Sequence, residues 1–186
     1  MGHAAYVDPP ADPLAALLAL AHPPAEADAR AFVDAVAPVA LDRPLWPVAH
    51  DEAADSAEVA ATGLLLSAIG YHESRLLPAV ATCATRGPGG SVTAYQLLGT
   101  HALAGWTVAE VCASPEIATR AALGVLELHG RRGLLVPAQV VAGYASGDAA
   151  RGSRAAREIV GIWVTLCRSA RVECSPFSFA RPRWIR

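Results

Sequence analysis

A continuous apolar stretch that ends in a carboxylate is the feature that most constrains the fold of this chain. Residues 63–72 read Gly-Leu-Leu-Leu-Ser-Ala-Ile-Gly-Tyr-His and are followed by Glu73. At 100° per residue in an α-helix, Glu73 shares a face with Ile69 and Leu66. The spacing predicts that Glu73 points to the interior or to the wall of a cleft. The alternative is that Glu73 begins the solvated end of the helix.

A carboxylate in such a place has a chemical use. Partial burial beside apolar side chains disfavours the charged form of a carboxylate. A general acid that works near neutral pH needs this property, because it must still hold its proton there. Glu73 is therefore the candidate catalytic residue.

Composition predicts a mostly α-helical fold. The chain has 186 residues, of which 53% are hydrophobic, and alanine supplies much of that fraction. Alanine favours helix more than any other residue, while the alternating runs typical of strands are nearly absent. This length suits one hydrophobic core with appendages. We expect an acidic, proline-punctuated extension with short helices over 1–45, a helical domain over 46–174 and a basic tail over 175–186.

Capping residues and prolines place the elements. A long helix is expected from the cap Asp55-Ser56 to Glu73, and a loop or small β excursion over 83–92. Prolines at 38 and 47 predict a joint between the extension and the domain. The other expected helices cover residues 13–21, 25–36, 91–98, 107–112, 115–129, 137–144 and 151–167.

Three segments in the same order resemble the soluble lytic transglycosylases and their goose-type lysozyme relatives. They are Glu73-Ser74-Arg75-Leu76-Leu77-Pro78, Gly90-Ser91-Val92-Thr93-Ala94-Tyr95-Gln96 and Ala142-Gly143-Tyr144-Ala145-Ser146-Gly147. In that family a helix ends in Glu-Ser, a Gly-rich loop leads to a Gln, and a Tyr-containing segment follows. The resemblance covers roughly residues 50–150. The sequence departs from the family pattern at Thr93, Tyr95, Gly99 and Ala145.

The resemblance implies a lysozyme-like helical domain and a reaction without a cofactor. Glu73 would protonate the glycosidic oxygen between N-acetylmuramic acid and N-acetylglucosamine, and then act as base toward the C6 hydroxyl, which gives a 1,6-anhydro product. Ser74 would orient the N-acetyl group or Glu73, Tyr95 and Gln96 would line the cleft, and Tyr144 would hydrogen-bond near Glu73. No Asp or Glu lies between Ser74 and Ala109, so a nearby second carboxylate is not expected.

Other interpretations remain open. Ser74 can simply terminate its helix, and Tyr144 can be a core aromatic whose hydroxyl is satisfied. A goose-type lysozyme-like muramidase would hydrolyse the same bond, with Asp148 as the first candidate base. An inactive lysozyme-like module for wall binding or particle assembly is a third possibility. Binding of nucleic acid is disfavoured, because the chain lacks interleaved aromatic residues and a basic overall charge.

Charge is distributed unevenly along the chain. Residues 1–60 carry ten acids and two Arg, a net charge of −8, whereas residues 131–186 carry ten Arg and three acids, a net charge of +7. The basic part can attract the acidic part or an anionic wall polymer. The partners expected are thus peptidoglycan strands, with such a polymer as an alternative partner of the Arg-rich part.

Cysteines and targeting signals suggest a cytoplasmic origin. Cys83, Cys112, Cys167 and Cys174 form no CxxC pair and have no His at a metal-ligand spacing, so structural zinc is not expected. We expect four free thiols, with Cys167–Cys174 as the easiest bridge to close. No signal peptide and no transmembrane run is recognisable, which predicts action at the wall after non-classical release, by phage lysis, a virion or a secretion particle.

Overall fold

The computed structural model describes residues 12–42, 45, 52–98, 105–131, 137–146, 154–172 and 174. These residues form a mostly α-helical fold, as the composition predicts, and no strand occurs among them. The long helices are α2 (Glu26–Asp42), α3 (Glu52–Ser74), α7 (Pro115–Arg131), α8 (Pro137–Ser146) and α9 (Arg154–Ser169). Short elements are α1 (Pro13–Leu18), α4 (Pro78–Ala81), the 3-10 turn η1 (Pro88–Gly90) and α6 (Val108–Ala113). None of the described helices combines the length and the apolar character needed to cross a membrane.

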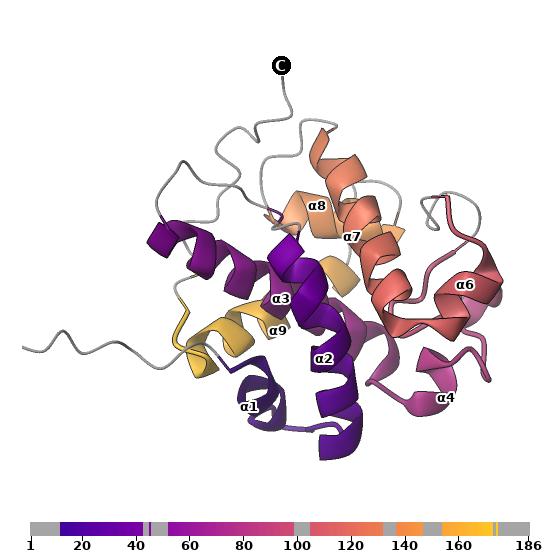
Figure 1. Ribbon diagram of the computed structural model, residues 1–186, viewed down its shortest axis with the longest axis horizontal. Coiled ribbons are helices and arrows are strands. Elements are labelled where there is room, and N and C mark those ends of the chain that lie inside the picture. Colours follow the sequence, from indigo (N-terminus) through magenta and orange to yellow (C-terminus); the bar gives the residue numbers. More distant parts are fainter. Residues whose placement is uncertain are drawn as a thin grey trace, which may run out of the picture.

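Helix α3 is the centre of the molecule. Residues 61–71 are buried without interruption, and α3 packs against α1, α2, α7 and α9. Figure 1 shows α3 between α2 and α9. A helix that is hydrophobic on all sides is stable in water only when other helices surround it. Glu73 directly follows this apolar run, so its carboxylate lies at the end of the buried helix.

Small residues let α2 approach α3 closely. A Cβ atom on Gly70 would lie 2.3 Å from Cζ of Phe32, so the Phe32 ring occupies the space that a larger residue would need. Gly63 similarly faces Ala40 and Val36 across the same helix pair. Because α1 also packs on α3, the helices expected in an N-terminal extension contribute to the same core as the rest of the molecule.

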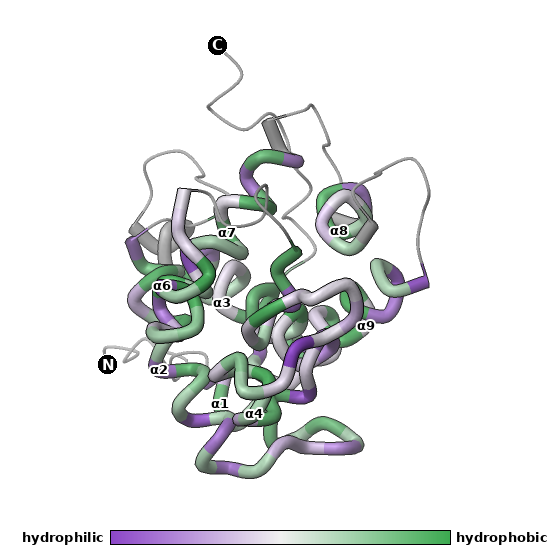
Figure 2. The backbone as a smooth tube through the Cα atoms, turned by 90° about the vertical axis from the view of Figure 1, so that its right-hand side faces the viewer, coloured by the Kyte–Doolittle hydropathy of each residue, from purple (hydrophilic) through white to green (hydrophobic). Residues whose placement is uncertain are grey.

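Helix α9 is amphipathic and covers another side of α3. Its residues Ile159, Trp163 and Leu166 are buried against the core, while Arg157, Glu158 and Arg168 are exposed. Figure 2 shows both hydrophobic and hydrophilic residues along α9. The indole N–H of Trp163 donates to the carbonyl of Ala61 at 3.1 Å, which fixes α9 against α3. Burial of this polar N–H is stabilising only because it has this partner.

The structure corrects several expected boundaries. Helix α3 begins at Glu52, so Asp55 and Ser56 lie within it and do not cap it. Helix α2 continues through Pro38 to Asp42 instead of ending before it. Pro38 removes one backbone donor, but continuing the helix buries Val39 and Ala40, which are 0% and 2% exposed. The expected helix over residues 91–98 is a tight turn with one antiparallel bridge between Val92 and Leu97.

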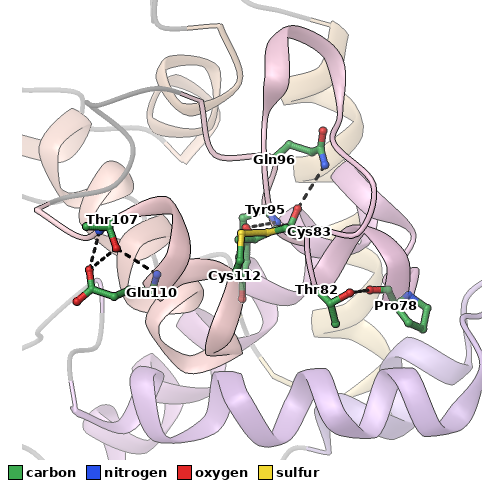
Figure 3. The surroundings of a disulfide bond; sticks show 9 residues. Pro78, Thr82, Cys83, Tyr95, Gln96, Thr107, Glu110 and Cys112 are labelled. Carbon is green, nitrogen blue, oxygen red and sulfur yellow. Dashed lines mark hydrogen bonds between the residues drawn. A yellow bond between two sulfur atoms is a disulfide. The ribbon is translucent and has the colours of Figure 1, made fainter.

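The cysteines are paired, which corrects the expectation of four free thiols. Cys83 is bonded to Cys112 and Cys167 to Cys174. The second pair is the bridge that the sequence identifies as easiest to close. The first could not be read from spacing, because its partners are 29 residues apart and meet only when α6 packs beside the loop after α4. Figures 1 and 3 show this junction between α4 and α6.

Several predicted segments lie outside the described residues. These are the first residues of the extension, the joint around Pro47 and the basic tail over 175–186. Docking of the acidic end on the basic end stays a prediction for the same reason. Within the described residues, α1 does pack against α9.

Candidate functional site

Glu73 lies in the last turn of α3 and is partly exposed. Its side chain is 21% exposed, whereas Ile69 and Leu66 on the same face are 0% exposed. This is the half-buried position that the helical spacing predicts. One carboxylate oxygen, Oε1, lies 3.3 Å from Nδ1 of His72. Glu73 can therefore reach solvent while it remains attached to the rigid end of a buried helix.

Ser74 is used by the helix end itself. Its hydroxyl donates to the carbonyl of Gly70 at 2.8 Å and accepts from the backbone N–H of Leu76 at 3.1 Å. The chain then turns sharply, because Arg75 and Leu76 both have positive φ values of 54° and 59°. Ser74 is 6% exposed. These contacts fit the interpretation that Ser74 terminates the helix, and neither of them is with Glu73.

Gln96 holds together the loop that follows η1. Its Oε1 accepts from the Ser91 hydroxyl at 2.6 Å, and its Nε2 donates to the carbonyl of Thr93 at 3.3 Å. A Cβ atom on Gly87 would overlap the side chains of Gln96 and Ser91, so glycine leaves room for this bond. Gln96 is half-buried. The side chain predicted to line a cleft is thus engaged in shaping its own loop.

Tyr95 lies in the core instead of on a cleft wall. It is 1% exposed, its ring centroid is 5.4 Å from that of Phe32, and its hydroxyl is 3.1 Å from the hydroxyl of Thr119 on α7. Burial raises the pKa of Tyr95 far above its ordinary value. The prediction that its side chain contacts substrate does not fit this position. Through its backbone, however, Tyr95 contributes to the site.

Tyr144 on α8 completes the group around Glu73. Its hydroxyl donates to the carbonyl of Tyr95 at 2.7 Å. Burial raises the pKa of Tyr144 well above its ordinary value, and the nearby negative charge of Glu73 raises the pKa further. The phenol therefore stays protonated as a donor. Tyr144 thus lies close enough to Glu73 to feel its charge and is bonded to the loop of Tyr95.

The Cys83–Cys112 bond closes the segment that carries this loop. Figure 3 shows the disulfide next to Tyr95 and Gln96, with α6 on its other side. Helix α6 begins with a capping box, in which Thr107 and Glu110 bond each other's backbone N–H groups. The covalent bond and the capped helix limit how far the loop can move from the end of α3.

Sequence reasoning missed two polar residues beside Glu73. His72 contacts Glu73 through Nδ1, and its Nε2 lies 3.2 Å from Oε2 of Glu158 on α9. His72 was recognisable only as a neighbour in sequence. Glu158 is 86 residues away, and only the packing of α9 on α3 brings it there. Asp148, the candidate base of the hydrolase alternative, lies outside the described residues.

The described residues contain no group of three or more side chains placed to hold a metal ion. Comparison with models of known protein families, with curated proteins and with solved structures finds no match to this chain.

Proposed function

We propose that this chain cleaves peptidoglycan as a lytic transglycosylase, with Glu73 as its acid and base. The observation that supports this most is the position of Glu73: a partly exposed carboxylate at the end of a buried helix, with Tyr144 of another helix nearby. A proton donor held on a rigid element keeps its geometry through the reaction. Glu73 would donate to the glycosidic oxygen and then take the proton of the C6 hydroxyl, which leaves it unchanged after each cycle.

The surroundings of Glu73 favour one catalytic carboxylate over two. Glu158 is the second carboxylate that the described contacts bring toward Glu73, but the imidazole of His72 lies between them and contacts both. An inverting hydrolase needs room for water between its two carboxylates. Here a side chain occupies that space. This arrangement supports attack by the substrate's own C6 hydroxyl.

The loop near Tyr95 supports the resemblance at a position where the residue type differs. Thr93 replaces the glycine usual in the family, yet its φ is 66°, in the left-handed region that glycine favours. Its hydroxyl accepts from the backbone N–H of Tyr95 at 3.3 Å, a local bond that glycine cannot make. Thr93 thus adopts a backbone conformation that a glycine at this position would also favour.

The two disulfides support action outside a reducing compartment. Disulfides persist mainly in secreted, periplasmic or surface proteins, because cytosolic thiol systems keep cysteines reduced. Cys83–Cys112 and Cys167–Cys174 use every cysteine of the chain. The cell wall lies on the oxidising side of the membrane, which is where a peptidoglycan-cleaving enzyme must work.

The product distinguishes the proposed reaction from its alternatives. Purified sacculi are digested in ¹⁸O water, and the released muropeptides are analysed by mass spectrometry. We expect 1,6-anhydromuramic ends that are lighter than hydrolysed ends by one water and carry no ¹⁸O. Reducing ends with ¹⁸O would establish the muramidase alternative, and no release at all would favour the inactive wall-binding module.

The Glu73→Gln variant tests whether wall lysis depends on the Glu73 carboxyl group. Loss of a general acid lowers the rate by about 10²- to 10⁴-fold. Glu116→Gln is the matched control, because it makes the same change on an exposed turn of α7, where Glu116 contacts Arg120. Activity of the Glu73→Gln variant above about a tenth of the wild-type rate would contradict the assignment.

A further inference from the structure

His72 lies between two carboxylates on different helices. Nδ1 is 3.3 Å from Oε1 of Glu73, and Nε2 is 3.2 Å from Oε2 of Glu158. The His72 side chain is 17% exposed, so solvent screens these contacts less than it would on an open surface. On the far side of Glu158, Nε of Arg154 donates to Oε1 of Glu158 at 2.7 Å. The four side chains form one continuous polar line from the surface of α9 to the end of α3.

Both neighbours of His72 stabilise its charged form. The hydrogen bond with Glu73 is the largest influence that raises the pKa of His72, and Glu158 raises it further, while burial acts in the opposite direction. Further out, Arg154 of α9 contacts Glu158, Tyr144 of α8 feels the charge of Glu73, and Tyr71 and Arg75 are close to His72 in sequence at the end of α3. Arg75 stacks over the Tyr71 ring, with its Cζ 4.6 Å from the ring centroid.

We propose that His72, held by Glu158, is a positioning residue that orients Glu73 and supplies its proton. With the imidazolium present, both ring nitrogens donate, one to each carboxylate, and Glu73 is held as a carboxylate in a fixed orientation. When His72 is neutral and donates from Nε2 to Glu158, Nδ1 has a free lone pair. It can then accept a hydrogen bond from a protonated Glu73.

The catalytic consequence rests on the proposed function. In the acid step, the His72 proton moves from Nδ1 to Oε1 of Glu73, across the contact of 3.3 Å. Substrate that excludes water favours this transfer, because a neutral pair loses less hydration than an ion pair. The proton passes to the glycosidic oxygen and is replaced from the C6 hydroxyl.

Activity as a function of pH tests the control of Glu73. His72→Gln keeps a hydrogen-bonding side chain but removes the charge that titrates. We expect the alkaline limb of its wall-lysis profile to move to lower pH, because the imidazolium that supplies the proton is missing. Glu116→Gln, on an exposed part of α7, should leave the profile unchanged. An unshifted limb in an active, folded His72→Gln protein would overturn the proposal.

Titration of His72 by NMR tests the same contacts without any activity. The His72 ring signal is assigned by its absence from the His72→Gln spectrum and is followed from pH 4 to pH 10. Its midpoint should lie above the ordinary value of 6.5 and should fall in both Glu158→Gln and Glu73→Gln. A midpoint that neither substitution changes would overturn the proposal even if the enzyme were active. If wild-type protein releases no muropeptides, the proposed function fails, and this titration alone decides whether His72 couples the two carboxylates.

Discussion

Glu73 has two contrasting sides. On one side, Tyr144 and Tyr95 are joined by a hydrogen bond of 2.7 Å, and Tyr95 is buried at 1% exposure. On the other side, His72 contacts Glu158, whose side chain is 46% exposed. Tyr95 lies in the core and Tyr144 packs against it, and neither phenol changes charge near neutral pH. The His72 side consists of groups that do change charge.

The two sides differ in what their contacts do: one kind fixes the positions of atoms, and the other responds to pH. Buried neutral hydrogen bonds fix atoms firmly, because breaking one leaves a desolvated polar group without a partner. Partly exposed ion pairs contribute little to stability but respond to pH and salt. We infer that the tyrosine side holds the loop near Glu73 in place, whereas the His72 side carries the charge that responds to pH.

The largest effect on stability is expected from the covalent closure of the tyrosine side. Replacing Cys83 and Cys112 by Ser opens a loop with a sequence separation of 29, which should lower the free energy of unfolding by about 3.5 kcal/mol. The same change at Cys167 and Cys174, separated by 7, should lower it by about 2.5 kcal/mol. Urea unfolding of the three proteins measures both values. The reverse order would show that the loop of Tyr95 is held mainly by its non-covalent contacts.

Tyr144→Phe should have the next largest effect. It removes the donor to the Tyr95 carbonyl, and an unsatisfied buried acceptor costs about 1–3 kcal/mol. The loss should be the same from pH 5 to pH 8, since the phenol stays protonated throughout. Tyr71→Phe is the matched control, because the Tyr71 hydroxyl donates to the His22 carbonyl at 2.6 Å, away from the Tyr95 loop. Loss of wall lysis in Tyr144→Phe alone would show that this bond positions the site.

Much of the fold follows from local sequence patterns. The apolar run before Glu73 gives α3 and its half-buried end, and Thr107 with Glu110 gives the start of α6. Local patterns do not predict the backbone where contacts between residues distant in sequence determine it. Burial of Val39 carries α2 past Pro38, although proline normally ends a helix. Positive φ values at Thr93 and Gln96 make a turn of a segment whose apolar residues suggest a helix.

The candidate site divides in the same way. The partial burial of Glu73 was predictable from its spacing, because its position on a single helix determines how far its side chain is exposed. The roles of Tyr95 and Gln96 were not, since their partners, Thr119 and Ser91, are known only once the loop is folded. Pairing of His72 with Glu158 joins two helices that are far apart in sequence. No local signal identifies such a pair.

The pH dependence of stability should distinguish the His72 side from the tyrosine side. The raised pKa of His72 stabilises the fold fully below its unfolded value of 6.5, and this contribution is lost as pH rises through the folded value. The lowered pKa of Glu158, caused first by Arg154, contributes stability above 4.5 that is lost as pH falls through the folded value. The stability difference between wild type and His72→Gln should therefore be largest between about pH 4.5 and 6.5, at up to about 1 kcal/mol, and should vanish by pH 9. A difference independent of pH would show that His72 acts by packing.

The smallest effect is expected from Arg154→Ala, at the outer end of the polar line. The Arg154 side chain is 88% exposed, and its pair with Glu158 is an i,i+4 contact on the surface of α9. Solvent and salt screen such pairs, so neither the melting temperature nor wall lysis should change measurably. The His72 midpoint should rise slightly at low salt, because a nearby cation is removed while Glu158 remains ionised. At about 1 M salt the rise should disappear, since screening then acts over about 3 Å. A fall in the midpoint would instead mean that Arg154 orients Glu158 toward His72, and the control of charge would then extend to the surface of α9.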